Sequence, residues 1–292
     1  MRGNLAAALR FLMRAVGGMA GLRVRCAMVR CAAAGVCSLA MPDAALLALL
    51  LAAAFAAGTL NSVAGGGSFL TLPALVFSGL PPVVANATGT VALLPGYLSG
   101  AWGFRADLQA PPGLTLAQLA LISLVGGAAG AALLLFTGER TFAALVPWLL
   151  LAATALFAVA PLLMRRARAR AGTAASRWRA SAGVLLVSAY GGYFNGGLGI
   201  LLLALFGLLG QHDLNAANAG KNVVSALLTA VAVLVYLAGG LVAWPQALAM
   251  MLAATAGGYA GARLARRMPP LVLRVLIVAI GLAMSALFFL RG

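Results

Sequence analysis

The chain has 292 residues, of which 64% are hydrophobic and only 8% are charged. This composition is far more apolar than that of a soluble globular domain, and it excludes a protein built around a water-soluble core. The formal net charge of +16 comes from arginines that gather in short connecting segments and near the N-terminus. That distribution favours the positive-inside bias of a membrane protein, in contact with anionic lipid, over nucleic-acid binding.

Residues 1–40 contain no Asp or Glu and are rich in Arg and Ala. This composition is similar to that of a targeting peptide, and the segment 41–43 leads directly into the first strong apolar run. We therefore expect residues 1–40 to be a basic extension upstream of the true start. All three cysteines lie in this segment, and their spacing does not fit a zinc site, so no metal ion is expected; they are Cys26, Cys31 and Cys37.

Apolar runs that approach the length of a membrane span, about 20 residues, recur along the rest of the chain. The predicted spans are 44–62, 84–104, 115–137, 142–164, 182–199, 216–238, 245–264 and 271–290. Two further apolar pieces, 68–77 and 200–209, are too short to cross, which is typical of re-entrant or half-helical segments buried in protein. The predicted fold is an all-α polytopic membrane protein of about eight transmembrane helices.

The first half of the chain returns in the second half. The sequence Gly58-Thr59-Leu60-Asn61, followed by Ala85-Asn86-Ala87, is echoed by Gly192-Tyr193-Phe194-Asn195 and Ala217-Asn218-Ala219. A glycine-rich face at 126–131 is likewise matched at 257–262, and such small-residue faces usually pack helices together. We therefore predict two homologous four-helix repeats, 41–164 and 182–292, joined by an Arg-rich cytoplasmic linker at 165–181. Broken helices at matched positions mark the binding sites of many transporters.

The glycine run Gly65-Gly66-Gly67 offers exposed backbone N–H groups to an anion, although a tight packing turn is the alternative interpretation. Four asparagines at matched positions favour a polar cavity over four separate interhelical hydrogen bonds. Lys221, the only lysine, lies one turn from Asn218 and either meets an anion or extends to the membrane surface. The predicted substrate-binding residues are Asn61, Gly65, Gly66, Gly67, Asn86, Thr88, Asn195, Gly199, Asn218, Lys221 and Asn222.

The acidic residues indicate which solute to expect. All four lie at span edges or in loops: Asp43, Asp107, Glu139 and Asp213. Cation-coupled carriers and metal permeases generally rely on carboxylates inside the membrane, so this pattern suits an anion better. A negative-inside potential drives a monovalent anion outward with about 2.3 kcal/mol per 100 mV. The motifs of hydrolases and metalloenzymes are missing, and we expect no enzyme activity.

At these residues the chain resembles the sulfite exporter TauE/SafE family of bacterial inner-membrane permeases. The family pattern of a polar residue, a glycine-rich turn, a proline and an Ala-Asn-x-Thr helix entry is matched by Asn61, Gly65-Gly66-Gly67, Pro73 and Ala85-Asn86-Ala87-Thr88. The chain departs from it at Gly89-Thr90, where the family often has an Asn-Lys pair, and at Gly199-Ile200, which replaces a fuller glycine cluster. The segment 217–222 keeps the Asn and the Lys.

The resemblance implies a multi-pass protein of the bacterial inner membrane that exports sulfite or small organosulfonates such as sulfoacetate, with no tightly bound cofactor. The expected partners are the small anion and the lipid bilayer, without nucleic acid, and a homo-oligomer is compatible with the sequence. Two alternatives stay open. One is a permease for another small solute or a metal ion, and the other is a membrane scaffold whose small-residue faces only hold helices together.

Overall fold

The computed structural model of the protein describes residues 44–63, 65–170, 176–211, 213–264 and 270–291. The predicted extension at 1–40, with its three cysteines, lies outside these residues. Within them the chain forms ten α-helices and one 3-10 turn, and no strand. The prediction of an all-α polytopic membrane protein is confirmed.

The helices follow the predicted apolar segments closely. The first half contains α2 (Ala44–Val63), α3 (Ser68–Phe77), α4 (Pro82–Gly103), the 3-10 turn η1 (Arg105–Asp107), α5 (Leu116–Phe136) and α6 (Glu139–Arg170). The second half contains α7 (Arg177–Tyr193), α8 (Leu198–Leu208), α9 (Leu214–Ala238), α10 (Trp244–Leu264) and α11 (Pro270–Arg291). In the described part of the chain, four helices are long and apolar enough to span a membrane: α2, α5, α6 and α9.

Local signals fix where several helices begin. Pro82 occupies the first turn of α4, where its missing N–H leaves no intrahelical bond unmade. Thr115 and Gln118 form a capping box at the start of α5. The Asp213 carboxylate accepts a hydrogen bond of 2.8 Å from the backbone N–H of Asn215 and caps α9. These caps satisfy N–H groups that the helices themselves leave free.

The second helix break differs from the prediction. The sequence suggested a fifth span over 182–199, but α7 ends at Tyr193 and the chain is non-helical from Phe194 to Gly197. Asn195 and Gly197 adopt left-handed backbone conformations, with φ of 60° and 71°. Asparagine and glycine tolerate this conformation, and it cannot continue a right-handed helix. Gly199 therefore lies inside α8 rather than in a turn before it.

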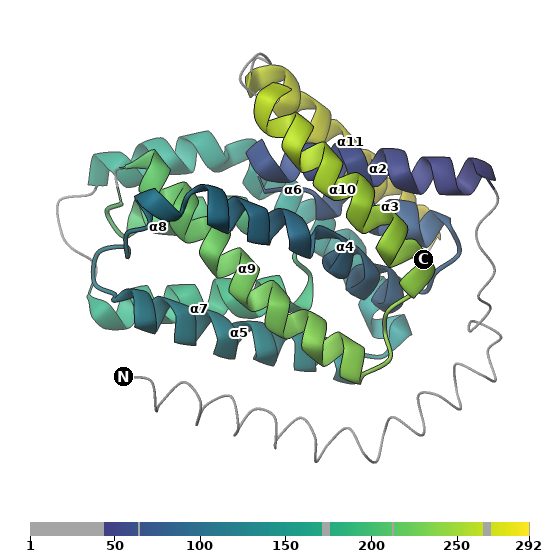
Figure 1. Ribbon diagram of the computed structural model, residues 1–292, viewed down its shortest axis with the longest axis horizontal. Helices are drawn as coiled ribbons and strands as arrows, with labels where there is room; N and C mark the ends of the chain where they lie inside the picture. The colour runs from purple at the N-terminus through teal and green to yellow at the C-terminus, as the bar shows by residue number, and fades with distance from the viewer. Residues whose placement is uncertain (1–43, 64, 171–175, 212, 265–269, 292) are drawn as a thin grey trace.

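The two halves of the chain interleave. α2 packs against α10, α5 packs against α7, and α9 crosses both α4 and α5 (Figure 1). In the same way α6 contacts α8 and α11, while α11 also contacts α3. Each half therefore supplies a partner helix for the other half. The contact between α2 and α10 has a counterpart in that between α7 and α5, and the contact between α6 and α8 has one in that between α11 and α3.

Glycines allow the closest of these contacts. A Cβ atom added at Gly257 would lie 1.9 Å from the Phe55 carbonyl oxygen, and one added at Gly130 would lie 1.9 Å from the Ala189 carbonyl oxygen. No side chain fits there, so α10 approaches α2 and α5 approaches α7 backbone to backbone. The Thr59 hydroxyl group adds a hydrogen bond of 2.9 Å to the Gly257 carbonyl group. The two glycine-rich faces thus pack helices, as such faces usually do.

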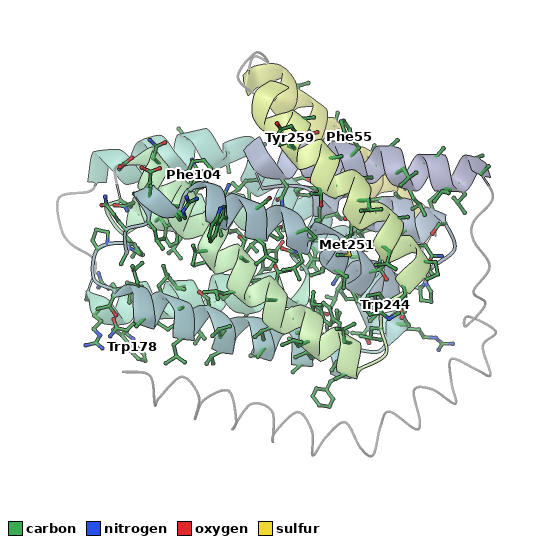
Figure 2. The ribbon with its side chains drawn as sticks, in the orientation of Figure 1. Phe55, Phe104, Trp178, Trp244, Met251 and Tyr259 are labelled. Carbon is green, nitrogen blue, oxygen red and sulfur yellow. The ribbon has the colours of Figure 1, made fainter. Side chains whose placement is uncertain are left out.

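The outer surface is apolar. Phe55 on α2 and Tyr259 on α10 are 43% and 65% exposed, and Figure 2 places both at the crossing of these helices. Trp178 at the start of α7 is 80% exposed. Large exposed apolar side chains are rare on soluble monomers, but they suit a surface in contact with lipid.

Candidate functional site

The two helix breaks meet inside the protein. Gly65, in the break between α2 and α3, has a φ of 79°, and a Cβ atom on it would lie 2.6 Å from the Cα atom of Gly199. The Ser68 hydroxyl group donates a hydrogen bond of 3.4 Å to the Asn195 carbonyl group across the same contact. The sequence placed these breaks in separate halves, and the fold brings them together.

Two short helices begin at this meeting point. The N-cap residues of α3 and α8 are Gly67 and Gly197, and neither supplies a side-chain cap. The N–H groups of a first helical turn have no partner within the helix and give that end a partial positive charge. Both helix starts thus direct positive dipole ends into the interior, an arrangement that favours an anion.

Tyr97 on α4 joins the two breaks. Its hydroxyl group donates a hydrogen bond of 3.2 Å to Asn195 Oδ1 and also has a side-chain hydrogen bond with Asn61. Asn61, Tyr97 and Asn195 are 7%, 3% and 1% exposed, and we call them the central cluster. Asn61 and Asn195 are the matched asparagines of the two halves. Sequence reasoning missed Tyr97, because a single tyrosine in an apolar helix carries no motif.

The central cluster has spare hydrogen-bonding capacity. Asn61 Oδ1 and Asn195 Nδ2 are buried and have no partner among the described residues. Buried polar groups are nearly always paired, so an unpaired donor and acceptor side by side need an explanation such as a bound solute. Asn195 also keeps its left-handed backbone conformation, which asparagine tolerates better than most residues.

Asn86 and Thr88 are bonded to backbone in this structure. Asn86 Nδ2 donates a hydrogen bond of 2.9 Å to the Tyr193 carbonyl group at the end of α7. Thr88 Oγ1 accepts one of 3.0 Å from the Ala243 N–H at the start of α10. Asn86 thus fixes the chain two residues before Asn195, and Thr88 ties α4 to α10. Both interactions position elements around the central cluster.

The glycine run is closely packed. A Cβ atom on Gly67 would lie 2.8 Å from the Ala57 carbonyl oxygen, and one on Gly66 would lie 3.3 Å from the Phe69 ring. Side chains at Gly65 and Gly67 would therefore separate the elements that meet there. The close contacts favour the packing-turn interpretation for these residues, and the Gly65 N–H group donates a hydrogen bond of 3.2 Å to the Leu60 carbonyl group.

Lys221 lies in the interior, on the second turn of α9. It is 2% exposed, and its ammonium group has no hydrogen bond or ion pair with any described residue. Asn222 beside it is 7% exposed and lies against Gly100 of α4, one turn beyond Tyr97. Asn218 is partly buried on the preceding turn. Lys221 does not extend to the surface, so that alternative fails.

The structure thus unites most of the predicted residues at two neighbouring places. Asn61, Asn195, Gly199 and the run 65–67 lie at the meeting of the helix breaks. Lys221 and Asn222 lie on α9 next to the α4 helix that carries Tyr97. Among the described residues no three His, Cys, Asp or Glu side chains lie together where they could hold a metal ion.

Comparison with known proteins places the chain in a family of transporters. It is 28% identical over 249 residues to a probable membrane transporter protein of Haemophilus influenzae, covering 82% of this chain and 93% of that protein. It is 29% identical over 255 residues to the probable membrane transporter protein ORF9 of a Sinorhizobium species, covering 82% and 91%. For the probable membrane transporter protein YfcA of Escherichia coli K12 the identity is 27% over 249 residues, covering 85% and 91%. No solved structure matches. The family profile of the sulfite exporter TauE/SafE matches residues 50–288, and the chain belongs to this family of membrane transporters.

Proposed function

We propose that this protein exports small anions, sulfite or organosulfonates, across the bacterial inner membrane. One observation carries the proposal. Two helix breaks, one from each half, meet at a buried cluster of Asn61, Tyr97 and Asn195 whose amides are only partly paired. Lys221, a buried and unpaired cation, lies on the adjacent helix α9. Asn86 and Thr88 hold the backbone of neighbouring elements around this place, and the glycines at 65–67 pack at the first break.

The groups gathered there suit an anion. Asn195 Nδ2 is a buried N–H donor without a partner among the described residues, and the starts of α3 and α8 bring the positive ends of two helix dipoles to the same place. Lys221 is the only charged residue among the buried residues that the structure describes. A buried ammonium without a partner is costly, and a bound anion would remove that cost.

The family supports transport in general, and its name points to sulfite for at least some members. The relatives from Haemophilus, Sinorhizobium and Escherichia are described only as probable membrane transporters, so the substrate rests on the site. The membrane potential would supply the driving force for export, about 2.3 kcal/mol per charge and 100 mV. An anion exported by the membrane potential needs no carboxylate inside the membrane.

The rival function is a membrane scaffold, and the glycine contacts of α2 with α10 and of α5 with α7 favour it. A scaffold, however, gives no reason for an unpaired buried lysine or for unpaired amide atoms at Asn61 and Asn195. Evolved interiors normally replace such groups by apolar side chains when nothing binds them. The transporter hypothesis explains both features together.

The proposal is tested by flux into proteoliposomes that contain the purified full-length protein. We expect uptake of sulfite or of a small organosulfonate above that of empty liposomes. Lys221→Ala should lower it at least about tenfold, because a buried charge partner is worth more than 1.4 kcal/mol. Gly138→Ala is the matched control, since a Cβ atom there meets nothing within 4 Å. Flux equal to that of empty liposomes for a panel of small anions would contradict the proposal.

A further inference from the structure

The buried side of α9 carries a line of three polar side chains. Lys221, Ser225 and Thr229 are four residues apart, and residues at this spacing lie above one another on one face of a helix. They are 2%, 0% and 0% exposed. We call them the polar ridge of α9. At 1.5 Å per residue the ridge is about 12 Å long.

The hydroxyl groups of the ridge are unsatisfied. Several other helical hydroxyl groups donate to the carbonyl group four residues earlier, as Thr90 does to Asn86 and Ser123 does to Leu119, although Thr71, Thr154 and Ser188 do not. Ser225 Oγ and Thr229 Oγ1 have no hydrogen-bond partner among the described residues. Together with the ammonium group of Lys221, three buried polar groups in a row lack partners, a combination that needs an explanation.

The polar ridge runs beside the central cluster. α4 and α9 cross in opposite directions, because Asn222 lies against Gly100 while Val91 and Val233 share one apolar cluster. On α4, Tyr97 lies between these two contacts. Ser225 and Thr229 occupy the corresponding stretch of α9. The ridge therefore lies along the same stretch of the contact between α4 and α9 as Tyr97.

Lys221 carries the only buried charge along the polar ridge among the described residues. The helices α4, α5 and α8, all packed on α9, contain no charged residue. α7 contributes only Arg177 and Arg179, both exposed at its start, and η1 contributes the exposed pair Arg105 and Asp107. The remaining charge on this side is Asp213, exposed at the N-cap of α9.

We infer that the polar ridge of α9 is the binding surface for a singly charged sulfonate-type oxyanion, such as bisulfite or a monosulfonate. The inference rests on the proposed function and specifies its substrate class. The oxygens of such a head group accept hydrogen bonds from the Lys221 ammonium group and the Ser225 hydroxyl group, and Thr229 offers a further donor one turn along the ridge. One negative charge matches Lys221, whereas a second negative charge would stay buried without a partner. Dianions, including sulfoacetate, should therefore be poor substrates.

The charge preference is measured by competition in proteoliposomes containing the full-length protein. Uptake of labelled methanesulfonate is measured in the presence of unlabelled methanesulfonate, ethane-1,2-disulfonate or neutral dimethyl sulfone. We expect the disulfonate to inhibit at least about tenfold more weakly than methanesulfonate, and the sulfone not at all. Equal inhibition by the disulfonate overturns the inference while the proposed function stands. No uptake of any anion, sulfite included, contradicts both.

Variants locate the binding surface. The double variant Ser225→Ala, Thr229→Val should raise the half-saturating methanesulfonate concentration about tenfold, and Lys221→Met should abolish saturable uptake while Lys221→Arg retains part of it. Ser188→Ala is the matched control, because that hydroxyl group is also buried and unpaired but lies at the contact of α7 with Gly126. If the double variant purifies and transports like the wild type, or if Ser188→Ala has the same effect, the inference is wrong.

Discussion

At the scale of single residues, the interior of this protein is organised by Tyr97. Its hydroxyl group links Asn61 and Asn195, which come from opposite halves of the chain. Each asparagine retains one unpaired amide atom. The tyrosine holds both asparagines in place and leaves part of their hydrogen-bonding capacity free. A solute that binds there would therefore lose little side-chain entropy by ordering them.

Replacing Tyr97 by phenylalanine should therefore affect both stability and transport. The change leaves Asn195 Oδ1 buried without a donor and should lower the free energy of unfolding by about 1–3 kcal/mol. Thermal unfolding in detergent and the half-saturating anion concentration in proteoliposomes measure the two effects. Phe77→Leu is the control, because that side chain is 64% exposed and should change neither value. An unaltered Tyr97→Phe protein would show that the central cluster needs no bridging hydroxyl group.

At the scale of elements, the breaks between α2 and α3 and between α7 and α8 decide the architecture. They end two helices inside the protein and turn the starts of α3 and α8 toward each other. Gly65 makes this possible in two ways, since its φ of 79° strains most other residues and a Cβ atom on it would lie 2.6 Å from the Gly199 Cα atom. The break in the second half uses Asn195 and Gly197 for the same turn of the backbone.

A methyl group at Gly65 should separate the two breaks. Gly65→Ala combines a strained φ with a contact of 2.6 Å to the Gly199 Cα atom, and should destabilise the protein by at least about 1–3 kcal/mol. Gly103→Ala, where a Cβ atom meets nothing within 4 Å, should stay within about 0.5 kcal/mol of the wild type. Thermal unfolding of both variants in the same detergent is the measurement. Equal stability of the two variants would refute the close contact between the breaks.

The positions of the helices follow from sequence because membrane-length apolar runs and their interruptions are local features. The eight predicted spans and the two short segments all correspond to helices. The predicted place of the second break was wrong because the fifth span was extended to 199 through Asn195-Gly196-Gly197, although this sequence favours a turn. The partners of Asn86 and Thr88, at Tyr193 and Ala243, and the role of Tyr97 depend on which helices meet, and a single sequence does not determine that.

At the scale of the whole molecule, the halves depend on each other. α2 finds its main partner in α10, and α7 finds its main partner in α5. Glycine contacts with no room for a side chain hold both pairs, for example Gly58 against Ala254 and Gly192 against Gly127. Neither half can bury these faces alone, so the predicted repeats act as one folding unit rather than as two domains.

Cutting the chain between the halves tests this dependence. The fragments 1–172 and 173–292, expressed together, should purify as one complex, because the helix pairs across the halves are still available. Each fragment expressed alone should aggregate or be degraded, which size-exclusion chromatography in detergent and the yield of membrane protein detect. A fragment that is monodisperse and helical by itself would contradict the interleaved arrangement.

The central claim is that the interior binds an anion through the buried charge of Lys221, and ligand-induced stabilisation tests it most directly. A ligand that binds only the folded state raises the unfolding temperature with its concentration. Methanesulfonate should raise that temperature in a saturable manner for the wild type and should not do so for Lys221→Met, while neutral dimethyl sulfone should leave both unchanged. Equal stabilisation of the wild type and Lys221→Met by methanesulfonate would contradict the account.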